Sequence, residues 1–162
     1  MTPLAKARAL ALIVPLALLG GAYGFQYVWA HLVPCEMCWW QRWAHFAALP
    51  FGVLALLVGS RMKDQGRLLV WLAALAIFVS GAIGVWHAGI ELKLLPGVTE
   101  CTASLTGSAA DMLKATFDRP MIRCDEVQWS WLGISMAGWN AIVSILSAVA
   151  ILWLSLRKPK AA

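Results

Sequence analysis

Four long stretches of the chain carry no aspartate, glutamate, lysine or arginine, and they constrain the fold more than any other feature. These stretches cover residues 9–35, 43–60, 68–90 and 127–156. Each reaches the roughly 18–20 residues that a helix needs to cross a hydrocarbon core about 30 Å thick. Backbone N–H and C=O groups find no water in lipid, so each stretch must pair them internally as a helix.

These stretches predict an all-α fold, an integral membrane up-down four-helix bundle. We place the spans at residues 9–33, 39–60, 68–90 and 127–156, and a long outer loop at 91–126. The whole chain, residues 1–162, then forms a single membrane domain.

Composition supports lipid as the solvent and excludes other classes. Hydrophobic residues make up 61% of the chain and charged residues 13%, whereas a soluble domain carries about 25% charged residues. The net charge of +5 does not indicate nucleic-acid binding, because the basic residues form short clusters between the apolar stretches. Lys6 and Arg8 before an apolar run also resemble a signal peptide, but the run exceeds the usual apolar core of about 7–15 residues. We therefore expect a retained helix.

The distribution of basic residues predicts the orientation. With the amino terminus in the cytoplasm, the two termini and the loop at 61–67 hold eight of the thirteen basic residues and one of the eight acids. This asymmetry fits the positive-inside rule, so both termini are expected in the cytoplasm. The four cysteines then face the other side of the membrane, where disulfides persist. Cys35 and Cys38 lie in the first outer loop, and Cys101 and Cys124 lie in the second.

The cysteine spacing favours disulfide chemistry over other sites. A structural zinc site commonly uses two CxxC pairs, and the second pair here is separated by 22 residues. A c-type haem needs CxxCH, and Trp39 stands in place of the histidine. Two inert disulfides are the main alternative, although a CxxC ring is small and tends to be strained and reducible. We therefore predict a dithiol–disulfide relay and no metal.

The segment PCEMCWWQR, residues 34–42, places this chemistry at a membrane boundary. Cys38 is expected at the amino terminus of the second span, where helix N–H groups favour a thiolate. Arg42 follows on the same helical face and would stabilise negative charge. His87 and Gln26 lie near the outer ends of their spans, and His45 is expected to point into the bundle. A lipid-soluble quinone is the acceptor that best fits a thiolate at this depth.

The chain resembles the disulfide bond formation protein B (DsbB) family of membrane oxidases. The resemblance covers nearly the whole chain, and its specific parts are PCEMCWWQR, VWHAGIE with His87, and CDEVQWSWLGISM. It implies a thiol:quinone oxidoreductase of the bacterial inner membrane, with its cysteine loops in the periplasm. The implied partner is a periplasmic thioredoxin-fold protein resembling DsbA, and the implied cofactor is ubiquinone or menaquinone.

The resemblance also implies a role for each site residue. Cys101 would form the mixed disulfide with the partner, Cys124 would exchange with Cys35, and Cys38 would face the quinone. Arg42 would stabilise charge on a quinone oxygen, and His87 would line the same pocket. Gln26 resembles a quinone-contacting glutamine of the family, with one more residue between it and the first cysteine.

Three alternatives stay open at this point. A vitamin K epoxide reductase-type enzyme also has a helical bundle with a CxxC pair, but its pair lies late in the bundle. A non-catalytic tetraspan protein would keep the disulfides as structural links. A related oxidase would serve another partner. Within the second loop, helical apolar spacing between residues 105 and 117 fits either a membrane-surface helix or a plain loop.

Overall fold

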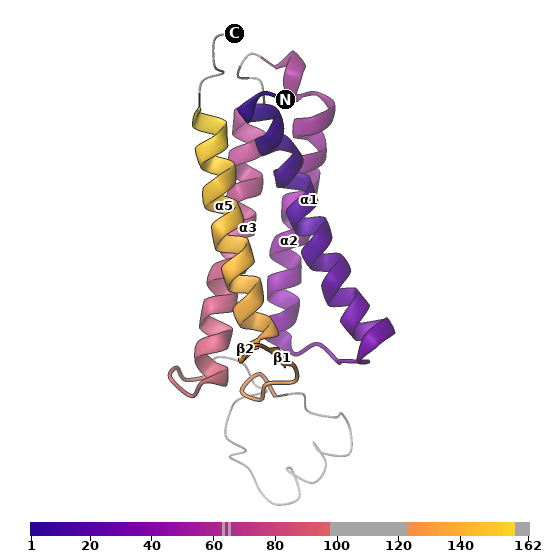
Figure 1. The fold of residues 1–162 in the computed structure, drawn as a ribbon, viewed down its shortest axis with the longest axis vertical. Helices are drawn as coiled ribbons and strands as arrows, with labels where there is room; N and C mark the ends of the chain where they lie inside the picture. The colour runs from indigo at the N-terminus through magenta and orange to yellow at the C-terminus, as the bar shows by residue number, and fades with distance from the viewer. Residues whose placement is uncertain (63, 65, 98–122, 158–162) are drawn as a thin grey trace, which may run out of the picture.

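Four long helices lie side by side in the computed structural model of the protein, which describes residues 1–62, 64, 66–97 and 123–157 (Figure 1). They are α1 (Pro3–Gly24), α2 (Glu36–Leu57), α3 (Arg67–Glu91) and α5 (Met136–Leu156). A π-helical turn, η1 (Phe25–Trp29), extends α1, and a 3-10 turn, η2 (Gly59–Arg61), follows α2. The predicted helical architecture is thus confirmed for the described part of the chain.

Three of the helical segments are long and apolar enough to cross a membrane. They are Pro3–Trp29, Arg67–Glu91 and Met136–Leu156. The fourth helix, α2, carries Gln41, Arg42 and His45 on one side, which lowers its apolar character. These side chains are all buried inside the bundle, so α2 can hold polar groups without presenting them to lipid.

The last helix begins later than the sequence indicated. The uncharged run starts at residue 127, but α5 starts at Met136. A two-stranded hairpin precedes it, in which β1 (Ser130–Trp131) pairs with β2 (Ile134–Ser135) in antiparallel register. Leu132 and Gly133 form its turn with φ angles of 52° and 77°, a conformation that favours a tight hairpin and excludes a helix.

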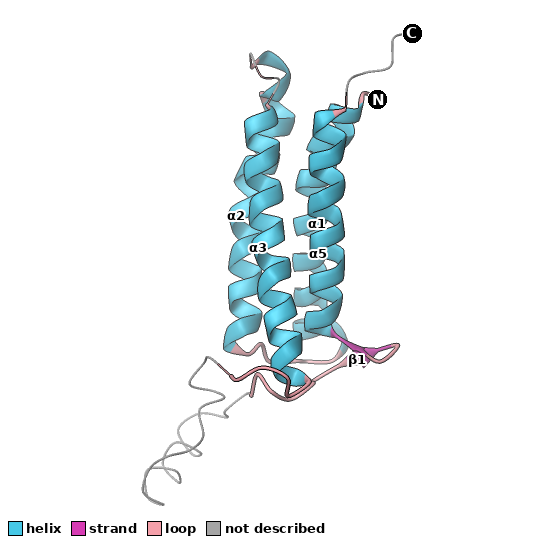
Figure 2. Cartoon of the chain, turned by 90° about the vertical axis from the view of Figure 1, so that its left-hand side faces the viewer, coloured by secondary structure: helices cyan, strands magenta, loops and turns pink. Residues whose placement is uncertain are grey.

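Ser135 then starts α5. Its hydroxyl accepts a hydrogen bond from the Gly138 backbone N–H at 3.1 Å, which is the usual cap at a helix amino terminus. The hairpin lies at the end of the bundle where α5 begins (Figure 2). It therefore contributes a rim to that end without extending the helix.

Small residues let the helices approach closely. The buried core cluster contains many alanines, namely Ala7, Ala48, Ala55, Ala74 and Ala148, with Val70, Ile77 and Ile151. A Cβ on Gly84 of α3 would lie 3.0 Å from the Ala137 carbonyl oxygen of α5, and one on Gly52 of α2 would lie 2.8 Å from the Ala11 carbonyl oxygen of α1. Such close backbone contact is how helices associate in lipid, where burial of apolar surface gives little driving force.

The bundle has two chemically different ends. The start of α1, the end of α5 and the turn η2 lie at one end, and the start of α2, the end of α3 and the β1–β2 hairpin lie at the other (Figure 1). The three cysteines in the described part of the chain are all at the second end. Cys101 and the segment at 105–117 lie outside the described residues.

Candidate functional site

The first two cysteines form the amino-terminal cap of α2. Cys35 is the N-cap residue, and its sulfur accepts a hydrogen bond from the Cys38 backbone N–H at 3.3 Å. Pro34 precedes Cys35 and has no backbone N–H to donate to a helical hydrogen bond. Both thiols are free, and their sulfur atoms lie 2.9 Å apart. Cys38 occupies the third helical position, so the prediction that it lies at the start of the second helix is confirmed.

Cys124 comes to this pair from the far side of the second loop. It is fully buried and packs with Cys35, Met37 and Ile90, with Cys38 at the edge of the same cluster. Its side chain forms a hydrogen bond with Cys35. The structure therefore brings together three sulfur atoms that lie up to 89 positions apart in the sequence.

An ion-pair cluster holds the loop beside Cys124. Asp125 bonds the Arg123 guanidinium at 2.8 Å and the Lys93 ammonium at 2.6 Å. These hydrogen bonds, first from Arg123 and then from Lys93, hold the pKa of Asp125 well below its usual range. The loop is thereby linked to the end of α3, which fixes Cys124 next to the start of α2.

His87 on α3 faces the cysteine cluster. Its Nε2 atom lies 3.7 Å from the Cys35 sulfur and 3.8 Å from a carboxylate oxygen of Glu91. Its Nδ1 atom lies 3.0 Å from the Gln41 amide nitrogen, which also donates to the Met37 carbonyl at 3.1 Å. Because Gln41 donates at that contact, Nδ1 accepts, and the neutral ring carries its proton on Nε2. The N–H of His87 is therefore directed toward the sulfur and carboxylate side.

A polar network continues from Gln41 into the bundle. The Asn140 side-chain nitrogen donates to the Gln41 side-chain oxygen at 2.8 Å and to the Ser80 backbone carbonyl at 3.2 Å. The Asn140 carbonyl oxygen bonds His45 Nε2 at 3.0 Å and accepts from the Ser144 hydroxyl at 3.2 Å. His45 thus points into the bundle, as the sequence predicted. This network fixes which nitrogen of each histidine carries the proton.

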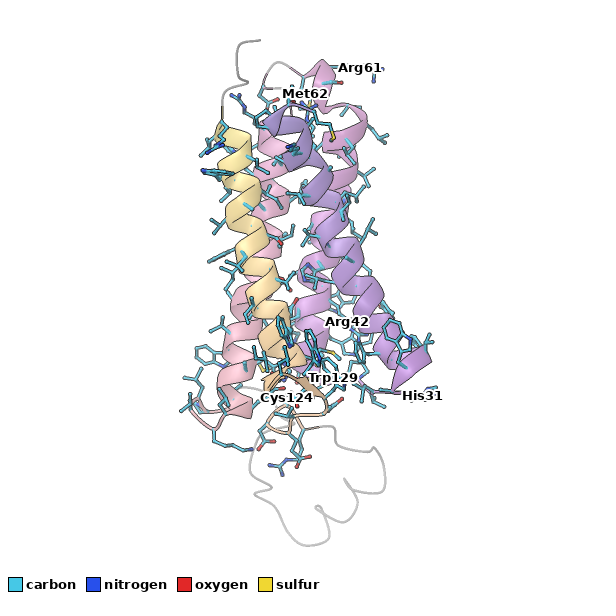
Figure 3. All side chains as sticks on the ribbon, in the orientation of Figure 1. His31, Arg42, Arg61, Met62, Cys124 and Trp129 are labelled. Atoms are coloured by element: carbon cyan, nitrogen blue, oxygen red, sulfur yellow. The ribbon has the colours of Figure 1, made fainter. Side chains whose placement is uncertain are left out.

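Arg42 lies on the first-helix side of the same end (Figure 3). Its guanidinium donates hydrogen bonds to the Gln26 side-chain oxygen and, at 3.4 Å, to the Ala22 carbonyl. The ring centroids of Tyr23 and Trp39 lie 4.8 and 5.1 Å from its central carbon. These contacts hold the cation at the end of the bundle that carries the cysteines. Gln26, predicted at a quinone site, is therefore the residue that orients Arg42.

A cavity of about 290 Å³ joins these groups. Its walls are mainly apolar, and its volume is near the lower limit of small-molecule sites. Residues from all four helices line it, including Leu18, Phe25, Cys38, Arg42, His87 and Asn140. The cavity is therefore lined by a cation, a histidine ring and a thiol pair at one end of the bundle.

The electrostatics distinguish the two thiols of the CxxC pair. Hydrogen bonds to Cys124 and Cys38, followed by burial, raise the pKa of the Cys35 thiol. The Cys38 sulfur instead accepts the Cys35 S–H and bonds the Cys35 backbone, and Arg42 attracts negative charge on it. Negative charge on this pair is therefore placed on Cys38.

The structure brings six of the seven predicted site residues to one end of the bundle. They are Cys35, Cys38, Cys124, Arg42, His87 and Gln26; Cys101 lies outside the described residues. The Cys35, Cys38 and His87 donor atoms lie within 4.8 Å of one another, and the absence of a metal stays a prediction. Sequence reasoning missed Gln41 and Asn140. An amide inside an otherwise apolar run was the available signal for Asn140.

Comparisons with known proteins place the chain in a family. The family model described as "Disulfide bond formation protein DsbB" matches residues 5–154. The disulfide bond formation protein B of Marinobacter nauticus is 30% identical over 161 residues, which cover 92% of this chain and 90% of that protein. That of Paracidovorax citrulli is 30% identical over 98% of this chain and 91% of its own length.

A third relative is the disulfide bond formation protein B 2 of Pseudomonas syringae, which is 31% identical over 86% of this chain and 82% of its own length. No solved structure matches. The chain matches the family model over most of its length, and it also has three helices that are long and apolar enough to span a membrane. The chain belongs to the DsbB family and is a disulfide-forming oxidoreductase of the membrane.

Proposed function

We propose that the protein reoxidises a periplasmic thioredoxin-fold dithiol protein and passes the electrons through its two cysteine pairs to a membrane quinone. The observation that carries this proposal is the meeting of Cys35, Cys38 and Cys124 beside a cavity that Arg42 and His87 also line. One side of the cluster belongs to the loop that meets water, and the other side opens to the bundle interior. Disulfide exchange and quinone chemistry need those two environments.

The route begins with an oxidised protein that holds the Cys101–Cys124 and Cys35–Cys38 disulfides. A thiolate of the reduced partner attacks Cys101, which breaks the Cys101–Cys124 bond and frees Cys124. The second partner thiol then releases the partner as a disulfide and leaves Cys101 reduced. The partner loses two electrons, and the second loop gains them.

Cys124 next attacks Cys35. The new Cys124–Cys35 bond forms as the Cys35–Cys38 bond breaks, and the electron pair of that bond leaves on Cys38. Attack at Cys35 is the favoured direction, because the better leaving group is the thiol that holds negative charge more easily. The helix terminus and Arg42 stabilise that charge on Cys38. Cys101 then attacks Cys124 to restore the second-loop disulfide, so that Cys35 and Cys38 carry both electrons.

The cavity fits the head group of a quinone. It is apolar and close to the thiol pair, and the fixed Arg42 guanidinium and the His87 ring line it. A bound quinone supplies an acceptor for two electrons, and its oxidising power restores the Cys35–Cys38 disulfide. Arg42 cannot release its proton at working pH, so its part is to bind and to stabilise negative charge. Gln26 and the Ala22 carbonyl keep the guanidinium in place for that task.

We also propose the four-span topology with both termini in the cytoplasm. The three apolar segments support it, and α2 completes the bundle with its polar residues turned inward. The basic turn η2, the start of α1 and the end of α5 lie at the end of the bundle opposite the cysteines. The positive-inside rule places that end in the cytoplasm and the thiols in the periplasm. The proposed location is the bacterial inner membrane.

Quinone reduction by the purified protein tests this function. The protein in detergent receives a reduced DsbA-like protein and either a ubiquinone or a menaquinone analogue, and quinone absorbance is followed. Wild type is expected to reduce the quinone, and Cys38→Ala is expected to lose that activity while remaining folded. No reduction by folded wild type with either quinone and several thioredoxin-fold partners would favour a tetraspan protein with structural disulfides.

A further inference from the structure

The His45 ring borders the cavity and has one nitrogen without a hydrogen-bond partner. The residue is 3% exposed, and it lines the cavity together with Asn140. Its Nδ1 atom is buried and bonds no atom within the described part of the chain. A buried polar atom that stays unpaired costs free energy. Because the ring borders the cavity, a molecule bound there can supply the missing partner.

A chain of hydrogen bonds determines what kind of partner Nδ1 requires. The Gln41 side-chain nitrogen donates to the Met37 backbone carbonyl, which can only accept, so the Gln41 side-chain oxygen faces Asn140. Asn140 therefore directs its nitrogen to Gln41, at 2.8 Å, and its oxygen to His45 Nε2, at 3.0 Å. Nε2 must then carry hydrogen. In a neutral imidazole the other nitrogen is an acceptor, so His45 Nδ1 requires a donor.

His45 lies deeper in the bundle than the thiol pair. It follows Cys38 by seven residues on α2, which is about two turns, or about 10 Å along the helix axis. Arg42 lies between them, and all three residues line the same cavity. A ligand that fills the cavity from Cys38 inward therefore lies near the Arg42 cation first and near the His45 acceptor at greater depth.

We propose that His45 Nδ1 accepts a hydrogen bond from a hydroxyl group of the reduced, hydroquinone form of the ligand, an inference that rests on the proposed function. A quinone oxygen carries no hydrogen and cannot donate to Nδ1, whereas a hydroquinone hydroxyl can. The cavity therefore binds hydroquinone more tightly than quinone. One hydrogen bond to a buried acceptor that otherwise stays unpaired is worth about tenfold in affinity.

This preference favours electron transfer to the bound quinone. A protein that binds one form of a ligand more tightly shifts the equilibrium toward that form by the ratio of the two affinities. For a two-electron couple, a tenfold preference for hydroquinone raises the reduction potential of the bound quinone by about 30 mV. His45 thereby helps the quinone to accept electrons from the Cys35–Cys38 pair.

Ligand binding to a chain that cannot turn over tests the proposal. Cys38→Ala in detergent is dialysed anaerobically against a short-chain form of the quinone that wild type reduces, or against the matching hydroquinone, and each Kd is measured. Adding His45→Leu is expected to raise the Kd of the hydroquinone about tenfold and to leave that of the quinone unchanged. Ser144→Ala removes another hydrogen bond of the same network and is the matched control, in which both Kd values are expected to stay unchanged.

Nitrogen-15 NMR tests the contact with His45 in place, so the result does not depend on how well His45→Leu folds. The Cys38→Ala chain is labelled at its histidines. The His45 Nδ1 resonance is expected at the position of an imidazole nitrogen without hydrogen. Hydroquinone is expected to shift this resonance, because Nδ1 then accepts a hydrogen bond, and the dimethyl ether of the same hydroquinone is expected to leave it in place.

Two sets of results would overturn the proposal. In the binding experiment they are an unchanged Kd of the hydroquinone in His45→Leu, or an equal rise in the Kd of both forms. In the NMR experiment they are a hydrogen on Nδ1 in the free protein, or a resonance that stays in place while hydroquinone binds. Failure of the proposed function gives a different result, because wild type then reduces no quinone and Cys38→Ala binds neither form.

Discussion

Replacing Asn140 with leucine tests the polar network that orients both histidines. The Asn140 amide bonds Gln41 at 2.8 Å and Ser80 at 3.2 Å, and its oxygen bonds His45 Nε2 at 3.0 Å. Hydrogen bonds between helices in a membrane bundle contribute about 0.6 kcal/mol each on average. Losing contacts to three residues on α2 and α3 therefore costs about 2 kcal/mol. The stranded His45 N–H, which is buried, gives a cost in the same range, about 1–3 kcal/mol.

A double-mutant cycle measures the coupling. His45→Leu and Asn140→Leu are made singly and together, and the free energy of unfolding is measured in mixed micelles by denaturant titration. The double variant is expected to be more stable than the sum of the single losses predicts, by about 1 kcal/mol, because neither partner is then left unpaired. Ser155→Ala provides the control. Ser155 is buried on α5 and bonds Trp71 at 2.9 Å, away from the network.

The control pair, Asn140→Leu with Ser155→Ala, is expected to be additive within about 0.5 kcal/mol. An additive result for Asn140 and His45 as well would refute the reasoning. So would an unchanged stability of the Asn140→Leu variant.

Three further predictions concern separate parts of the molecule. Arg42→Ala should raise the KM for quinone at least about tenfold, because a lost charge contact is worth about 1.4 kcal/mol or more. Thiol exchange with the partner should stay at the wild-type rate. A variant that loses this exchange and keeps normal quinone reduction would contradict the assignment. Gly84→Ala should lower stability by about 1–3 kcal/mol because its Cβ would press on α5, whereas Gly20→Ala, with open space around its Cβ, should not; equal melting temperatures would count against close α3–α5 packing. Asp125→Asn should lower the melting temperature between pH 5 and 8, and the difference should vanish well below about pH 4. The sign follows from the lowered pKa of Asp125, since its ion pairs stabilise the fold above the unfolded value and are lost on protonation; a difference that persists at the acid end would rule out this cause.

The helices could be predicted from the sequence because lipid leaves the backbone few choices. An uncharged run of sufficient length must be helical, and α1, α2 and α3 begin or end within a few residues of charged positions. The start of α5 could not be predicted by the same rule. The turn at Leu132 and Gly133 contains no charge, so a span defined by the absence of charge runs through it.

The candidate site was predictable only in part. The position of Cys38 at a helix terminus followed from PCEMC, and Arg42 followed from its spacing on the same helix. The approach of Cys124 to Cys35 came from the family resemblance, because spacing along a chain does not show how a long loop folds back. The Gln41–Asn140 pair joins α2 to α5 across 99 positions, and only the packed bundle reveals such a contact.

The most direct test of the account is whether Cys35 and Cys124 exchange with each other. A variant with Cys38→Ala and Cys101→Ala keeps only these two cysteines, and its partner control keeps Cys38 and Cys124 through Cys35→Ala and Cys101→Ala. Each is oxidised mildly in membranes, digested without reduction, and analysed for a cross-linked peptide. The account predicts rapid formation of a Cys35–Cys124 disulfide and much slower formation of the Cys38–Cys124 one. No Cys35–Cys124 link, or faster linking through Cys38, would contradict it.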